Sequence, residues 1–160
     1  MSDTPALRPF LPADTPVLAA IFAAAIAELT GDDYSEEQRG AWAAVAEDDA
    51  FGKALASELT LIATLRNAPV GFASLKGKDT IDMLYVHPGT ARQGVASMLL
   101  DALEKLAGGR GAAKLTVDAS DNAADFFRKR GYVARQRNSI TVNGEWLANT
   151  TMQKTLEGKP

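Results

Sequence analysis

Apolar residues recur at helical spacing through the first third of the chain. Thr15 fits an N-cap before Pro16, and Gly31 ends the first apolar pattern. Ser35 and Gln38, three positions apart, form a capping box for a second helix. These signals predict a short strand and then three helices. The expected ranges are 7–12 for the strand and 15–31, 35–45 and 48–56 for the helices.

After residue 58 the apolar period changes from helical spacing to two, which indicates strands. Three strands joined by tight turns predict an antiparallel meander over 59–65, 70–75 and 80–86. The pattern then predicts a helix, a strand, a helix and a hairpin, over 94–108, 114–119, 122–131, 132–140 and 145–154. Because a helix links 80–86 to 114–119, we expect these two strands to be parallel. The order predicts one domain of class α/β (α+β) over residues 1–160, with its core over roughly 5–156.

Composition excludes several classes of protein. The net charge of −3 argues against nucleic acid or an anionic membrane as partner. With no cysteine and a single histidine, His87, we expect no metal site. The N-terminus lacks the pattern of a signal peptide, and the apolar run 17–29 is too short to cross a bilayer and contains Glu28. A cytoplasmic protein is expected.

The segment 83–97 combines a strand, a polar loop and a helix start. Pro88 ends the strand, Arg92 and Gln93 lie in the loop, and Gly94 stands where the helix begins. Backbone N–H groups at a helix N-terminus favour anions, and glycine permits close approach of a ligand. The segment is therefore either an anion site or an ordinary connection between a strand and a helix.

Two motifs about 30 residues apart resemble the GNAT superfamily of N-acetyltransferases. They read Tyr85-Val86-x-Pro88 with Arg92-Gln93-Gly94-Val95-Ala96, and Asn122-Ala123-x-x-Phe126-Phe127-Arg128-Lys129-Arg130-Gly131-Tyr132. A C-terminal Gly144-x-Trp146-x-x-Asn149-x-x-Met152-x-Lys154 resembles a small bacterial branch. The resemblance implies the GNAT fold, a mixed central sheet of about seven strands with flanking helices. It also implies acetyl-CoA as donor and an amine as acceptor.

The resemblance assigns cofactor contacts to two segments. The backbone of Leu84, Tyr85 and Val86 would pair with the pantetheine arm. The pyrophosphate would bind at the helix start, through Arg92, Gln93, Gly94, Val95, Ala96 and Ser97. Asn122 and Phe127 would also contact the cofactor.

The chain departs from the family pattern at two positions. Ala91 replaces the first polar residue of the pyrophosphate motif, and Phe127 replaces the tyrosine that often protonates the leaving thiolate. The mechanism therefore cannot be carried over whole.

Candidate catalytic residues follow from the chemistry of amide formation, which needs a base for the amine and a donor for the thiolate. Asp82 is either the base or a strand-edge aspartate, and His87 is a base or a solvated loop residue. Tyr85 and Ser120 are either proton donors or structural residues. The acceptor pocket is expected to be bordered by Tyr34, Gln38, Trp42 and Trp146, although tryptophans are often core residues.

Two functions remain open. The chain is an acetyltransferase for a small-molecule amine, or it is a non-catalytic acyl-CoA-binding or regulatory module of the same fold. A Rossmann nucleotide-binding protein is disfavoured because Gly-x-Gly-x-x-Gly does not occur. The oligomeric state is left open, with a homodimer as one option.

Overall fold

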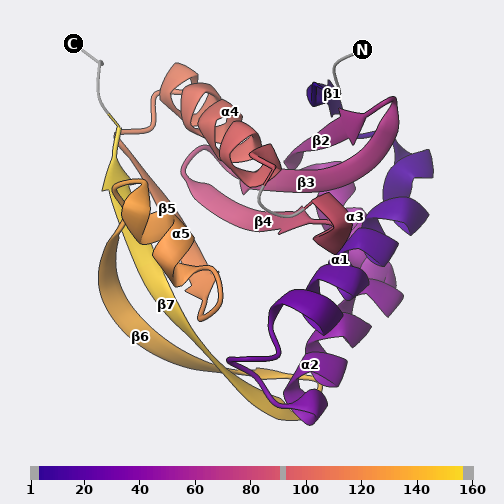
Figure 1. The fold of residues 1–160 in the computed structure, drawn as a ribbon. Helices are drawn as coiled ribbons and strands as arrows, with labels where there is room; N and C mark the ends of the chain where they lie inside the picture. The colour runs from indigo at the N-terminus through magenta and orange to yellow at the C-terminus, as the bar shows by residue number, and fades with distance from the viewer. Residues whose placement is uncertain (1–3, 91–92, 157–160) are drawn as a thin grey trace.

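A computed structural model describes residues 4–90 and 93–156. Within them, seven strands form one sheet in the order β1-β2-β3-β4-β5-β7-β6 (Figure 1). The strands are β1 (Ala6–Pro9), β2 (Leu59–Leu65), β3 (Ala68–Lys76), β4 (Thr80–Val86), β5 (Lys114–Ser120), β6 (Val133–Val142) and β7 (Glu145–Thr155). Neighbouring strands are antiparallel except β4 and β5, which are parallel. The predicted mixed sheet and the parallel pair are confirmed.

Helices cover both faces of the sheet (Figure 1). The α-helices are α1 (Thr15–Leu29), α2 (Glu36–Ala43), α3 (Asp49–Ser57), α4 (Val95–Gly109) and α5 (Ala124–Lys129). Short 3-10 turns are η1 (Pro12–Asp14), η2 (Ala44–Glu47) and η3 (Pro88–Thr90). Helices α4 and α5 lie on one side of the sheet, and α1, α2 and α3 lie on the other side.

Helix caps follow the sequence signals at two of three helices. Ser35 accepts from the Gln38 N–H, and the Gln38 side chain accepts from the Ser35 N–H, so the predicted capping box is present. Asp48 caps α3 through the Ala50 N–H. For α1 the predicted cap is one residue late, because the N-cap is Asp14. The Thr15 hydroxyl instead donates to the carbonyl of Pro12 in the preceding turn.

Each face of the sheet has its own apolar core. One core packs α4 and α5 on the sheet, with Leu99, Leu103 and Leu115 fully buried. Gly71 on β3 belongs to this contact, since a Cβ there would lie 3.1 Å from the Tyr85 carbonyl and from a Val95 methyl. Glycine thus lets α4 lie close to the strands that carry the site.

The second core lies under α1 and α3, with Leu18 and Phe72 at its centre. Joined to η1, helix α1 gives an 18-residue span, Pro12–Leu29, that is long and apolar enough by composition to cross a membrane. The apolar helical segment is therefore longer than the run 17–29 on which the sequence-based expectation rested. In this structure the helix packs against the sheet through Leu18, Ile21, Phe22, Ala25 and Ile26.

Candidate active site

The site lies where strands β4 and β5 separate. They pair only at Thr80 with Thr116 and at Ile81 with Val117, and β5 then pairs with β7 along its whole length. Beyond Ile81, β4 has no strand partner on its β5 side among the described residues. Backbone groups on this edge are therefore available to a ligand, which could pair with them as a strand would.

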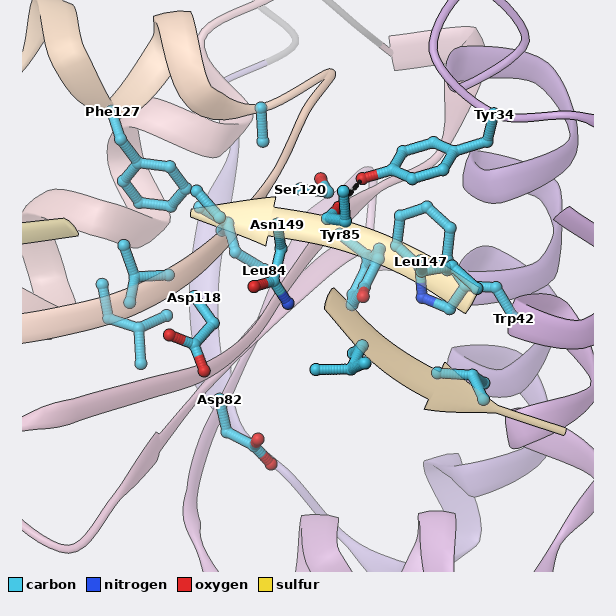
Figure 2. Close-up of a pocket in the computed structure, with 17 residues that line it drawn as sticks. Tyr34, Trp42, Asp82, Leu84, Tyr85, Asp118, Ser120, Phe127, Leu147 and Asn149 are labelled. Atoms are coloured by element: carbon cyan, nitrogen blue, oxygen red, sulfur yellow. Dashed lines mark hydrogen bonds between the residues drawn. The ribbon is translucent and has the colours of Figure 1, made fainter. Parts of the chain in front are cut away.

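A cavity of about 260 Å³ fills the gap between the two strands and is here called the central cavity (Figure 2). Strands β4, β5 and β7 form most of its walls, with aromatic residues of the α1–α2 region and of α5 at its sides. Its lining consists of Tyr34, Trp42, Ile81, Asp82, Leu84, Tyr85, Val117, Asp118, Ala119, Ser120, Ala123, Phe127, Ile140, Val142, Leu147, Ala148 and Asn149.

A second cavity of about 420 Å³, the side cavity, lies against α1, η2 and α3. Four residues line both cavities: Trp42, Asp82, Tyr85 and Val142. Asp82 and the two aromatic residues therefore stand at the boundary between two spaces, one along β5 and one under the N-terminal helices.

A β-bulge places Asp82 in this position. Ser74 of β3 pairs with Met83 and Leu75 pairs with Ile81, so Asp82 is the extra residue of β4. Bulges reorient side chains and occur beside active sites. In a regular strand Asp82 would share a face with Thr80 and Leu84, and the bulge interrupts this alternation. Ile81 and Leu84, three residues apart, pack in the same core, whereas Met83 packs in the other.

The central cavity carries negative charge. Asp82 and Asp118 point their carboxylates toward it from β4 and β5 (Figure 2), and no lysine or arginine is among its described lining residues. The Asp118 carboxylate also accepts from the Thr151 hydroxyl at 2.5 Å. Such a lining favours a cationic ligand over an anionic one.

Glu58, between α3 and β2, is an acid next to Asp82 that sequence analysis missed, although it is not among the residues that line either cavity. Burial and the adjacent Asp82 carboxyl raise the pKa of Glu58 to about 7, although Ser74 and Lys76 act in the opposite direction. The Glu58 Oε1 atom is buried and has no hydrogen-bond partner among the described residues. The predicted meander contained the signal, since adjacent β2, β3 and β4 bring the start of β2 near Asp82.

All three predicted catalytic residues reach the central cavity. Asp82, Tyr85 and Ser120 line it together. Burial raises the pKa of the Tyr85 phenol, an effect that neighbouring Trp42 partly offsets. Tyr85 therefore keeps its proton at neutral pH and can act only as a donor. Phe127, which is 3% exposed, lines the same cavity and has no hydroxyl to offer.

The start of α4 has the geometry of an anion site. Gly94 is its N-cap with φ of +84°, and a Cβ there would meet nothing within 4 Å. The first helical bond is donated by the Met98 N–H to the Gly94 carbonyl at 3.0 Å. The N–H groups of residues 95–97 precede this bond and have no partner within the helix. Ala91 and Arg92 lie outside the described residues.

An arginine that was not assigned from the sequence lies beside this helix start. Arg130, at the end of α5, donates to the Ser97 hydroxyl and lies over the Phe126 ring at 5.2 Å from its centre. It also pairs with Asp101 at 3.4 Å. Arg130 adds a positive charge near the predicted pyrophosphate position. Its hydrogen bond also uses the Ser97 hydroxyl as an acceptor.

The predicted acceptor wall is only partly assembled. Tyr34 and Trp42 line the central cavity, but Gln38 and Trp146 do not. Gln38 donates to the Trp146 carbonyl at 2.7 Å, and the Trp146 side chain is 64% exposed. Strand alternation explains the difference, because the next residue, Leu147, faces the cavity instead.

Asn122 is not among the residues that line the central cavity, and Tyr34 makes hydrogen bonds besides lining it. Asn122 is exposed in the turn after β5, and the neighbouring Ala123 lines the cavity. The Tyr34 hydroxyl donates to the Ala148 carbonyl at 2.6 Å (Figure 2). It also accepts from the Asp121 N–H at 2.9 Å. Tyr34 thus offers its ring to a ligand, while its hydroxyl connects the α1–α2 loop to β7 and to the turn after β5.

Comparison with known proteins agrees with this geometry. Residues 30–156 match the family described as "Acetyltransferase (GNAT) domain". A protein of Escherichia coli (strain K12), the "Uncharacterized N-acetyltransferase YafP", is 35% identical over 147 residues, which cover 92% of this chain and 93% of that protein. The crystal structure of a GCN5-related N-acetyltransferase from Rhodopseudomonas palustris is 66% identical with a TM-score of 0.95, and 98% of each chain is covered.

A more distant structure shares the fold. PaiA N-acetyltransferase from Thermoplasma acidophilum, solved in complex with coenzyme A, has a TM-score of 0.74 at 18% identity, over 95% of this chain and 99% of its own. The family match covers most of the chain, and the sequence relatives span nearly all of it. The chain therefore belongs to the GNAT family of acetyltransferases.

Proposed function

We propose that the protein transfers an acetyl group from acetyl-CoA to the amine of a small-molecule acceptor by direct attack on the thioester. The observation that carries the proposal is the separation of β4 from β5 beside the free N-terminus of α4, with Asp82 at a bulge on the same strand. Two proteins of this fold, PaiA from Thermoplasma acidophilum and YncA from Salmonella typhimurium, were solved with coenzyme A and acetyl-CoA, respectively.

The donor would bind along β4 and the start of α4. The unpaired edge at Leu84–Val86 would pair with the amide groups of the pantetheine arm. The pyrophosphate would receive N–H groups from the helix start, from Gly94, Val95, Ala96 and Ser97. The N–H of Gln93, which was also predicted to contact it, already donates to the Thr90 carbonyl at 3.3 Å. The positive φ of Gly94 and the open space in front of it fit a phosphate at this place. Arg130 supplies a cation nearby, and Arg92 stays a prediction.

The acceptor would enter the central cavity as an ammonium ion. Asp82 and Asp118 would attract the cation, and the Trp42 ring would offer it a π face. The ammonium must lose a proton before its nitrogen can attack the thioester carbonyl, and Asp82 is placed to take it. Tyr85 or Ser120 would protonate the leaving thiolate in place of the hydroxyl missing at Phe127.

A non-catalytic acyl-CoA-binding module is the second candidate. Phe127 favours it, because this residue lines the cavity without a proton to donate. In that case, coenzyme A would bind and no amine would be acetylated.

Thiol release from acetyl-CoA separates the two functions. The chain contains no cysteine, so a thiol reagent reads only the coenzyme A that is produced. We expect release that depends on an added amine, tested over monoamines, diamines and aromatic amines, with mass spectrometry of the product. Binding of coenzyme A by calorimetry without turnover on any amine would favour the binding module.

A further inference from the structure

Three polar groups from adjacent segments meet behind the central cavity. Ser74 of β3 pairs with Thr60 of β2 and with Met83 of β4, which brings its hydroxyl between Glu58 and the Asp82 bulge. Ser74 is fully buried, and neither its Oγ nor the Oε1 atom of Glu58 has a partner in good hydrogen-bond geometry among the described residues. The Ser74 hydroxyl is nevertheless near enough to Glu58 to lower the pKa of that carboxyl. A buried polar atom without a partner destabilises the fold, and such atoms occur at functional sites.

The charges around Glu58 explain why a proton is retained there. Asp82 lies against Glu58 from β4, and Lys76 of β3 is the cation that acts on it. Two adjacent carboxylates repel, so the pair gives up its last proton only at a pH well above the ordinary range of either acid. Asp82 is exposed to both cavities, whereas Glu58 is partly buried behind it.

We propose that Glu58 and Asp82 form a coupled carboxyl pair that is the base of the acetyl transfer. Asp82 contacts the acceptor, and Glu58 is a positioning residue behind it that shares the proton. This inference rests on the proposed function and adds the group that receives the proton.

The fully ionised pair takes one proton from the acceptor ammonium, and the proton is then shared between the two carboxyls. The free amine attacks the thioester carbon, a C–N bond forms, and the C–S bond breaks. The second N–H proton goes to the departing thiolate, which leaves as the thiol. The pair returns its proton to water, so each turnover releases one proton.

The pH dependence of turnover tests the pair. In the wild type, kcat/KM for the amine should be about tenfold lower at pH 6 than above pH 8, because an apparent pKa near 7 leaves about a tenth of the pair ionised at pH 6. Glu58→Gln should abolish this fall of kcat/KM toward low pH, the acidic limb of the pH profile. It should also lower kcat roughly 10- to 100-fold, with little change in the KM for acetyl-CoA.

Two controls separate this role from a structural one. Glu47→Gln makes the same change at an exposed position on η2, and it should keep both the rate and the limb. Ser74→Ala should keep the limb and move it to higher pH, because Ser74 lowers the pKa of Glu58. A Glu58→Gln enzyme that turns over with the wild-type pH profile would overturn the pair and leave the proposed function standing.

Titration of the carboxyl groups without substrate tests the pair independently of turnover. In ¹³C NMR of the side-chain carboxyls, Glu58 should titrate near 7, and Asp82→Asn should lower that midpoint because the neighbouring carboxyl is removed. A Glu58 midpoint near its ordinary value, or one that Asp82→Asn leaves unchanged, would refute the shared proton. If Glu58 titrates as expected and no amine is acetylated, the proposed function fails, and the base role fails with it.

Discussion

Replacing Glu58 with glutamine should stabilise the fold at pH 8 and leave its stability at pH 5 nearly unchanged. Glu58 has a pKa of about 7 in the folded chain, against an ordinary value of 4.5. Between these values the folded state binds more protons than the unfolded state, so stability falls as pH rises. The contribution of Glu58 to the free energy of unfolding is therefore fully present below pH 4.5 and is lost as the pH rises through 7. Glutamine keeps the neutral form at every pH.

The size of the effect follows from the same shift. The difference between the pKa of about 7 and the ordinary value of 4.5 corresponds to about 3.4 kcal/mol at most, at 1.36 kcal/mol per pH unit. Because Glu58 is only partly buried, solvent screening reduces this value, and we expect about 1–2 kcal/mol at pH 8. For a chain of this length that gain corresponds to roughly 3–6 °C in Tm.

Urea unfolding at pH 5, 6.5 and 8 measures the gain directly, and Glu47→Gln corrects for the change in net charge. The difference between Glu58→Gln and the wild type should grow with pH and level off above pH 7.5. An equal difference at all three values, or a loss of stability at pH 8, would refute the argument, because it would mean that Glu58 ionises without cost in the fold.

Three further predictions concern the cavity and the helix start. Gly94→Asp should weaken coenzyme A binding in calorimetry by at least about tenfold, whereas Gly144→Asp, which has a similar φ of +86° and equally open space, should bind normally; equal affinities would remove the phosphate assignment. Tyr34→Phe should cost about 1–3 kcal/mol in urea unfolding because two partly buried hydrogen bonds are lost, and a cost under about 0.5 kcal/mol would contradict this. Phe127→Tyr should raise kcat if protonation of the thiolate limits the rate, and an unchanged kcat would assign the limiting step elsewhere.

Local signals in the sequence predicted much of the fold. The Ser35 capping box, the Asn143-Gly144 turn and the glycine at the start of α4 each depend on residues a few positions apart. Asn143 and Gly144 have φ of +46° and +86°, as a tight hairpin requires. Short-range chemistry of this kind is visible without knowledge of the tertiary structure.

The missed features depend on register between strands. The bulge at Asp82 exists because β3 and β4 slip by one residue between Ser74 and Leu75, and nothing within β4 alone records it. The placement of Glu58 beside Asp82 needs the pairing of three strands. The alternation that turns Leu147 inward also turns Trp146 outward, so the choice between them required the orientation of the hairpin.

The Tyr34 hydroxyl gives the site a mechanical property. One end of β5 is joined to β4 by two strand pairs, and the Asp121 N–H at its other end is tethered through Tyr34 to the α1–α2 loop. Strand β5, which forms one wall of the gap, is thus held at both ends, by β4 at one and by the α1–α2 loop at the other. Acceptors should accordingly be sorted by width before any chemistry begins, and loosening the tether at Tyr34 should broaden the range of amines that enter.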